Sequence, residues 1–392
     1  MYAAHLQPVP YHPPWDLSFD ERMAMMRRGC PRAAYFYAVP DTSTFRYRAY
    51  NVAQALSAGS TRSGPSTAWF TEAELDRMGR VLDCCDVLVL CRNSLYNDGI
   101  ARLAAQARAR NRFVLFDVDD LVFDPAYVHL LVDTLGLDRR NPAVWDDWFA
   151  SVGRISATYA LCDGALVSNE YLAARAVAWS GKPARIIPNF LNREQQQLSD
   201  RVWDAKEASA WRRDGCTHLG YFSGSPSHNR DFSLVSGAIA RLMDQDVTLR
   251  LRVVGFLDIP PELEHQSHRI ESLPLQDFLN LQREIGAVEI NLVPLQQNPF
   301  THSKSELKWF EAAVVGTLTV ASPTHAYCRV IEHGRNGWLA ESHRWEATLR
   351  ETLRGLDDHR AEIAPYAREQ AREQYGWDRQ AATIESALFA NW

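Results

Sequence analysis

The feature that most constrains the fold is an alternation of short apolar runs with longer helical patterns. In the first half of the chain, apolar runs occupy residues 33–39, 67–70, 86–91, 113–117, 165–168 and 185–188. In the second half they occupy residues 218–222, 249–254, 288–295 and 318–321. Buried strands that alternate with helices pair in parallel and are connected by right-handed crossovers. The sequence therefore predicts an α/β protein with doubly wound parallel sheets.

The alternation is interrupted once, by a polar and charged stretch at residues 192–213 that predicts a helix or linker. We therefore expect two Rossmann-like domains, at residues 1–205 and 206–376. The final helix, at residues 377–392, could lie against either domain and is provisionally joined to the first. Two doubly wound domains in tandem predict a nucleotide-binding cleft between them.

Composition and charge restrict the class of function. The chain has 392 residues, of which 46% are hydrophobic and 23% charged, as in ordinary globular proteins. A formal charge of −6 argues against nucleic-acid binding, which needs a basic surface. No apolar run reaches the roughly 18–20 residues that span a bilayer, and the N-terminal residues lack the pattern of a signal peptide. Seven cysteines without a CxxC pair are typical of a reducing compartment, so we expect a cytoplasmic protein.

The segment 298–316 carries the strongest chemical signal. It follows an apolar run and places Lys304 and Lys308 one turn apart at the start of a predicted helix, with Glu311 three residues further on. A helix start after a strand binds anions, because free backbone N–H groups and the helix dipole point at the ligand. The pattern predicts phosphate contacts from the lysines and a diol contact from Glu311, as a nucleotide sugar requires. With two serines that can cap this helix, the candidate donor-binding residues are Ser303, Lys304, Ser305, Lys308 and Glu311.

The same segment also fits an amphipathic core helix with a solvated polar face. The apolar stripe of that helix is Leu307, Phe310, Ala313 and Val314. The chain has 42 lysines and arginines together, and only four of them are lysines. Two of the four fall in this segment, whereas a solvated face in this chain is expected to use arginine.

A loop rich in small and polar residues follows the apolar run 218–222. Its small residues let a ligand approach the backbone, and its basic residues offer charge to a diphosphate. The candidate donor-binding residues of this loop are Gly224, Ser225, His228 and Arg230. A plain Gly/Ser loop capped by Asp231 is the alternative, because a single loop of this kind is a weak signal.

An aspartate string follows the run 113–117 in the first half. Asp117, Asp119 and Asp120 stand where a parallel strand ends, which suggests either acid/base or metal chemistry or else a turn and helix cap. Arginines that follow other strands are expected to face the same cleft, or to be structural partners of the aspartates. Those residues, with one asparagine, are Arg46, Arg48, Arg92 and Asn93. We take Asp119, Asp120 and Arg92 as the candidate catalytic residues and expect no bound metal.

Three stretches together resemble a known family. They are FSGSPSHNRDF, NPFTHSKSELKWFEA and TVASPTHAYCRVIEHGRNGWL. In this order they are similar to the retaining, nucleotide-sugar-dependent glycosyltransferases of family 4, which have the GT-B fold. The N-terminal stretches FRYRAYN, FDVDDLVFD and IIPNFLN fit the bacterial branch that acts in O-antigen, capsule and exopolysaccharide synthesis. The resemblance covers about residues 33–339.

The resemblance implies an N-terminal acceptor domain and a C-terminal donor domain. It implies a UDP-, GDP- or dTDP-sugar as cosubstrate, no further cofactor, and a glycan or lipid-linked acceptor for a hexosyl or deoxyhexosyl group. Glu311 matches the second glutamate of the family's E-x7-E motif, which contacts the ribose. The first glutamate, which touches the donor sugar, is replaced by Ser303. The expected location remains the cytoplasm, which includes peripheral association at the inner face of the membrane.

Two other functions fit the same architecture. A sugar-nucleotide epimerase would keep the diphosphate site without an acceptor groove. A non-catalytic partner in a polysaccharide-assembly complex would bind the nucleotide sugar without turnover. A dinucleotide oxidoreductase is disfavoured, because no G-x-G-x-x-G follows either half's first strand.

Overall fold

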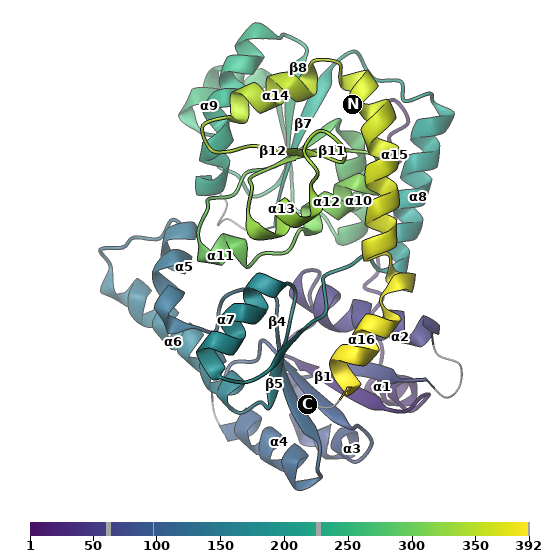
Figure 1. The fold of residues 1–392 in the computed structure, drawn as a ribbon, viewed down its shortest axis with the longest axis vertical. Helices are drawn as coiled ribbons and strands as arrows, with labels where there is room; N and C mark the ends of the chain where they lie inside the picture. Colours follow the sequence, from purple (N-terminus) through teal and green to yellow (C-terminus); the bar gives the residue numbers. More distant parts are fainter. Residues whose placement is uncertain (60–63, 97, 225–228, 391–392) are drawn as a thin grey trace.

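The computed structural model describes residues 1–59, 64–96, 98–224 and 229–390. It contains two six-stranded sheets, one in each half of the chain (Figure 1). The strands of the first sheet are β1 (Arg32–Tyr37), β2 (Ser66–Thr71), β3 (Val87–Cys91), β4 (Phe113–Val118), β5 (Gly164–Val167) and β6 (Ala184–Ile186). Those of the second sheet are β7 (Thr217–Ser223), β8 (Leu249–Gly255), β9 (Ile270–Leu273), β10 (Ile290–Val293), β11 (Leu318–Ala321) and β12 (Trp338–Leu339).

Both sheets are parallel, and each has one point where the strand order reverses. The first sheet has the order β2-β1-β3-β4-β5-β6, and the second has the order β12-β11-β10-β7-β8-β9. The reversals fall between β1 and β3, where Ala33 pairs with Val87, and between β7 and β10, where Leu219 pairs with Ile290. Open parallel sheets bind ligands at such a point, outside the carboxyl ends of the strands. The predicted α/β class with two doubly wound sheets is confirmed.

Helices cover both faces of each sheet. In the first half they are α1 (Phe19–Met26), η1 (Arg46–Tyr50), α2 (Asn51–Gly59), η2 (Glu72–Arg77), α3 (Met78–Leu82), α4 (Asp98–Ala109), η3 (Pro125–Tyr127), α5 (Val128–Thr134), α6 (Pro142–Ala160) and α7 (Glu170–Ser180). In the second half they are α9 (Asn229–Gln245), η5 (Pro261–Arg269), α10 (Phe278–Ala287), α11 (Pro299–His302), α12 (Leu307–Ala313), α13 (His325–Val330) and α14 (Trp345–Leu353).

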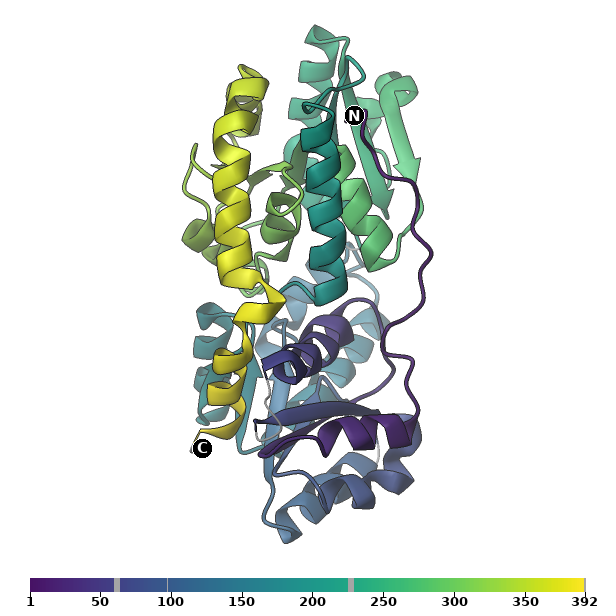
Figure 2. The ribbon, with the colours of Figure 1, turned by 90° about the vertical axis from the view of Figure 1, so that its right-hand side faces the viewer.

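Two long helices run beside each other on one side of the molecule, α8 (Arg193–Ala208) and α15 (Leu356–Tyr375) (Figure 2). They lie where the chain passes between the halves, and the polar stretch predicted as a helix or linker forms α8. After α15 the chain returns to the first half through η6 (Trp377–Arg379) and α16 (Ala381–Phe389), which packs on α2. The first residues run along the second half, where the backbone N–H of Tyr2 donates to Ala287.

One apolar cluster joins the two halves. Tyr47 and Phe45 of the first half belong to the same buried cluster as Phe278 and Phe310 of the second half. Trp15 stacks on Phe278 with ring centroids 6.0 Å apart. Because burial of aromatic side chains is strongly stabilising, this shared cluster holds the two halves against each other.

Among the described residues, no helix is both long enough and apolar enough to cross a membrane.

Candidate functional site

Two adjoining cavities lie between the halves, at the carboxyl ends of the strands that flank both reversal points. One, the apolar cavity, has a volume of about 340 Å³ and a mainly apolar lining. The other, the polar cavity, has a volume of about 330 Å³ and is named for the charged side chains in its lining, which are Arg92, Asp119, Asp120, Lys304 and Lys308. The residues that line both are Ser43, Tyr47, Gly224, Leu307 and Lys308. The two cavities therefore form one continuous candidate site.

The apolar cavity is built by the second half and closed by the first. Its apolar walls come from the ends of β7 and β8, the loop before α10, α10 itself and α12. These residues are Phe222, Val254, Leu275, Phe278, Leu281, Ile285 and Leu307. Arg46 and Tyr47 close it from η1, and Glu311 of α12 is its acidic residue. A flat apolar ring with a polar edge fits such a cavity.

Glu311 is held by three side chains that come from two other elements, η1 and α8. Its Oε1 accepts hydrogen bonds from the Tyr47 hydroxyl and from Gln195 Nε2 at 2.8 Å. The Arg46 guanidinium lies 3.6 Å from the same oxygen. Glu311 is 3% exposed, so its charge needs these partners.

The polar cavity is lined by charged residues of both halves. Lys304 lies in the turn before α12, and its Nζ is 3.5 Å from Asp120 Oδ1. Lys308 lies on α12, with its Nζ 5.5 Å from the centre of the Tyr221 ring. Among the described residues, no carboxylate forms an ion pair with Lys308. Lys308 is therefore a cation at the junction of the two cavities, and no described residue forms an ion pair with it.

Burial, together with the nearby charge of Lys304 and against the charges of Asp231 and Glu311, lowers the pKa of Lys308 to about 8. The protonated form is the one that attracts a diphosphate. As the pH rises through 8, Lys308 loses its proton. Binding of a diphosphate then requires that Lys308 take up a proton. We expect the affinity for UDP to fall about tenfold between pH 7 and pH 9, while the affinity for uridine stays flat.

Lys308→Arg is the control for this pH dependence. A guanidinium stays protonated over the whole range, so calorimetric titration of this variant should show the same UDP affinity at pH 7 and pH 9. A parent protein whose UDP affinity does not change over this range would contradict the assignment of Lys308.

Arg92 organises the aspartates of the polar cavity. It follows β3 with φ 50°, and its guanidinium donates to Thr44 Oγ1 at 2.9 Å. The same nitrogen lies 3.2 Å from Asp119 Oδ1 and 3.5 Å from Asp120 Oδ2. Burial raises the pKa of Asp119, Arg92 lowers it, and the neighbouring charge of Asp120 raises it again. The three predicted catalytic residues thus lie together at the cavity wall.

Asp117 and Arg48 are structural partners away from the cavity. Arg48 Nε donates to Asp117 Oδ1 at 2.7 Å and its second terminal nitrogen donates to Oδ2 at 3.2 Å. Both residues are 0% exposed. Arg48 also donates to the carbonyl of Ile187 and to Asn189 Oδ1. Of the two interpretations of these residues, the structural one fits this pair.

Several other candidate residues do not line the two cavities. Ser303 is fully buried, and its hydroxyl donates to the carbonyl of Pro299 at 2.8 Å. Arg230 pairs with Asp133 of the first half. Asn93 is buried and donates to Glu72 at 3.0 Å. Ser225 and His228 lie outside the described residues, so their predicted contacts stay predictions.

Gly224 and Ser305 do line the polar cavity. A Cβ at Gly224 would meet no atom within 4 Å, so the backbone conformation does not by itself require glycine there. Ser305 accepts a hydrogen bond from Asn189 at 3.1 Å, which ties the two halves together beside the cavity.

The prediction that Ser303 and Ser305 cap one continuous helix is wrong. The segment forms two helices, α11 and α12, and α12 begins only at Leu307 without a side-chain cap. Asn298 and Thr301 form a capping box and Pro299 occupies the first turn, so an earlier helix starts there and ends at Ser303. Lys304 consequently lies in the intervening turn and still reaches the polar cavity.

The sequence patterns missed several uncharged residues that line the cavities. Tyr47, Thr44, Asn189 and Tyr327 line the polar cavity, and Phe278 lines the apolar one. Tyr47 is part of the run FRYRAYN after β1, and Asn189 is part of IIPNFLN after β6. Polar or aromatic residues in the segments that follow the strand ends were the available signal.

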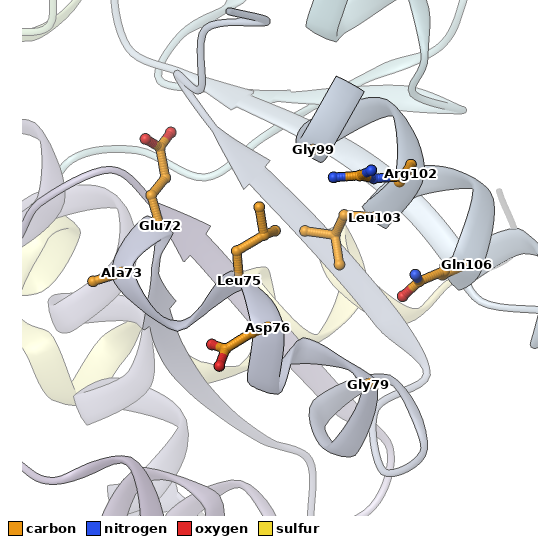
Figure 3. A pocket seen from close by; sticks show the side chains of 9 residues that line it. All are labelled: Glu72, Ala73, Leu75, Asp76, Gly79, Gly99, Arg102, Leu103 and Gln106. Atoms are coloured by element: carbon orange, nitrogen blue, oxygen red, sulfur yellow. The ribbon is translucent and has the colours of Figure 1, made fainter. Parts of the chain in front are cut away.

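A larger hollow of about 700 Å³ lies elsewhere, between η2 with α3 and helix α4 of the first half (Figure 3). Glu72, Leu75 and Asp76 form one side, and Arg102 and Gln106 lie on α4 opposite. It contains none of the predicted site residues. We therefore take the inter-half cavities, which lie at the reversal points and gather charges of both halves, as the candidate site.

Residues 217–358 match the family model described as glycosyl transferases group 1. No curated protein matches the chain in sequence.

Among solved structures, Alr3699/HepE from Anabaena in complex with UDP is 14% identical, covering 91% of this chain and 100% of that chain with a TM-score of 0.59. Sucrose-phosphate synthase from Thermosynechococcus elongatus is 14% identical, covering 90% and 97%, with a TM-score of 0.57. WaaG, a glycosyltransferase involved in lipopolysaccharide biosynthesis, is 13% identical, covering 91% and 99%, with a TM-score of 0.57. At these identities the likeness concerns the fold. The chain thus has the GT-B fold of known glycosyltransferase structures, and its second half matches the glycosyl transferases group 1 family.

Proposed function

We propose that the chain is a glycosyltransferase that moves a sugar from a nucleotide-diphosphate donor to a hydroxyl group of a glycan or lipid-linked acceptor. The observation that carries the proposal is the junction of an apolar and a polar cavity at Lys308, between two doubly wound sheets. The match of residues 217–358 to a glycosyltransferase family supports it.

Each part of a nucleotide-sugar donor has a partner in this arrangement. The base fits the apolar cavity beside Phe278, and the ribose diol fits Glu311 at its wall. The diphosphate fits Lys308 and Lys304, because ammonium groups and phosphate oxygens form strong charge-assisted hydrogen bonds. The sugar then lies in the polar cavity, beside Arg92, Asp119 and Asp120.

The charges suit the breaking of the bond between sugar and diphosphate. Departure of the nucleoside diphosphate places negative charge on its terminal phosphate and positive charge on an oxocarbenium-like sugar. The lysines stabilise the first charge. The carboxylates of Asp119 and Asp120 stabilise the second or receive the proton of the acceptor hydroxyl.

The replacement of the family's first glutamate by Ser303 concerns the sugar contact. The Ser303 hydroxyl donates to the Pro299 carbonyl and does not face the cavity. We therefore propose that Asp120 and Lys304, which form an ion pair at the cavity wall, recognise the sugar. Because this glutamate is missing, a non-catalytic protein that binds the nucleotide sugar is one of the outcomes that the test below distinguishes.

The finer features of the proposal follow from the family resemblance. We propose retention at the transferred hexosyl or deoxyhexosyl carbon and a place in bacterial surface polysaccharide synthesis, in the cytoplasm or at the inner face of the membrane. The first domain, at residues 1–205 with the final helix 377–392, binds the acceptor. The second domain, at residues 206–376, binds the donor.

The proposal is tested by a thermal-shift screen with UDP, GDP, dTDP and their sugars, followed by incubation with the selected donor and extracted lipid-linked glycans. A ligand at 100 times its Kd raises the free energy of unfolding by roughly 2.7 kcal/mol, so one nucleotide should stand out. Transfer to the glycan is the expected result. Conversion of the donor alone would indicate an epimerase, and binding without any turnover would indicate the non-catalytic partner.

Transfer should not depend on a divalent metal. Asp119 and Asp120 already have Arg92 and Lys304 as cationic partners, and the diphosphate has Lys308. Activity measured in excess EDTA should therefore equal activity in buffer alone. Loss of activity in EDTA that manganese restores would overturn this prediction and assign the aspartates to a metal site.

A further inference from the structure

The two carboxylate oxygens of Glu311 have different environments. Within the part of the chain that the structure describes, its hydrogen bonds from Tyr47 and Gln195 and its ion pair with Arg46 all meet Oε1, and Oε2 has no partner. Glu311 also lines the apolar cavity. A ligand in that cavity therefore finds Oε2 as the available acceptor.

The partners of Oε1 are themselves fixed by burial and by one another. Gln195 accepts a hydrogen bond from Arg46 at 2.9 Å and donates to Gln282 at 3.0 Å. Gln282 donates to the backbone carbonyl of Glu311 at 2.6 Å. The Arg46 guanidinium lies 4.0 Å from the centre of the Tyr47 ring. A buried network with these mutual bonds keeps each side chain in one orientation.

The two consecutive residues that reach this carboxylate lie on an unusual turn of the backbone. Residues Arg46–Tyr50 form one turn of π-helix, η1, directly after the loop that leaves β1. Such turns are rare and are found frequently at functional sites. Arg46 and Tyr47 both face Glu311 here, whereas the next residue, Arg48, bonds Asp117 of the first sheet.

We propose that Tyr47, with Gln195 and Arg46, is a positioning residue of the donor site. By occupying Oε1 it orients the Glu311 carboxylate, so that Oε2 accepts the hydrogen bond of a ribose hydroxyl. Because Tyr47 and Arg46 belong to the first half, the nucleotide affinity of the second half depends on a side chain that the first half supplies. This inference rests on the proposed donor site, in which Glu311 contacts the ribose.

The test compares UDP with 2′,3′-dideoxy-UDP, which lacks both ribose hydroxyls, by calorimetric titration. The parent protein should prefer UDP, and Glu311→Ala should remove that preference. Tyr47→Phe keeps the ring and removes only the hydroxyl. We expect it to weaken UDP binding about tenfold and to leave 2′,3′-dideoxy-UDP binding within about twofold of the parent.

Tyr50→Phe is the matched control, since Tyr50 is a buried tyrosine of the same π-helical turn whose hydroxyl accepts from Gln54 instead. It should bind both ligands like the parent. A Tyr47→Phe variant that weakens both ligands equally has lost structure rather than orientation, and that result would overturn the inference.

The double variant Glu311→Ala with Tyr47→Phe completes a double-mutant cycle with the two single variants. In the Glu311→Ala background the second substitution should have no further effect on UDP, because no carboxylate is left to orient. If Glu311→Ala does not change the preference for UDP, the proposed ribose contact itself fails. If it does and Tyr47→Phe does not, only the positioning role fails.

Discussion

Arg48→Met should lower the free energy of unfolding by about 3–5 kcal/mol, because it leaves the carboxylate of Asp117 buried without its charge partner. Both side chains are 0% exposed, and Arg48 supplies two hydrogen bonds to Asp117 and two more to Ile187 and Asn189. A loss of this size is a large part of the 5–15 kcal/mol that stabilises a typical protein. Urea unfolding followed by tryptophan fluorescence measures it.

The loss should depend on pH in a defined direction. Burial raises the pKa of Asp117 from 3.8 to about 6 even with Arg48 in place. A group whose pKa is raised in the folded state takes up a proton more readily there than in the unfolded chain. The buried charge is therefore relieved as the pH falls, and the deficit of Arg48→Met should be smaller at pH 5 than at pH 8.

Arg102→Met is the control for the Arg48 variant. Arg102 also pairs with an aspartate, Asp98, at 2.9 Å, but the two side chains are 66% and 69% exposed. Exposed ion pairs contribute little to stability, so the free energy of unfolding of this variant should lie within about 0.5 kcal/mol of the parent value. Equal losses for the two arginines would contradict a structural role for the Arg48–Asp117 pair.

Lys308→Ala should weaken the binding of UDP by roughly 10- to 150-fold and leave the binding of uridine unchanged. The range corresponds to a charge-assisted hydrogen bond of about 1.5–3 kcal/mol, at 1.4 kcal/mol per factor of ten. Lys304→Ala should act in the same direction, although its ammonium already shares charge with Asp120. Glu311→Ala should weaken UDP and uridine alike, because both carry the ribose.

Ser303→Ala is the matched control in the same segment. Its hydroxyl is buried on the Pro299 carbonyl and lies outside both cavities, so nucleotide affinity should stay within about twofold of the parent. If the lysine and glutamate variants also bind both ligands like the parent, the segment is core and the donor site lies elsewhere.

Ten of the twelve described strands and the charged part of the site could be predicted from the sequence. The strands β9 and β12 were missed, because β9 is partly exposed and β12 has only two residues. Apolar runs mark strands that are buried on both faces, and polar residues directly after them mark the ligand edge of a parallel sheet. Lys304, Lys308, Glu311, Arg92, Asp119 and Asp120 were found in this way, and all of them line the cavities. The rarity of lysine in the chain strengthened the choice of two of these residues.

The contacts between the halves could not be predicted, because they depend on how the two sheets face each other. Nothing local to FRYRAYN indicates that Tyr47 bonds Glu311, a residue of the other half that is far away in sequence. The division of the segment 298–316 into α11 and α12 was missed for a local reason. Pro299 and the Asn298–Thr301 capping box start a separate helix. The prediction instead placed a single helix start at the later lysines.

The most direct test of the account is a crystal structure of the protein with UDP bound. We predict the uracil ring in the apolar cavity beside Phe278, the ribose hydroxyls on Glu311 and the diphosphate on Lys308. UDP bound only outside the space between the two sheets, or a diphosphate that does not contact Lys308, would contradict the proposal that these cavities form the donor site.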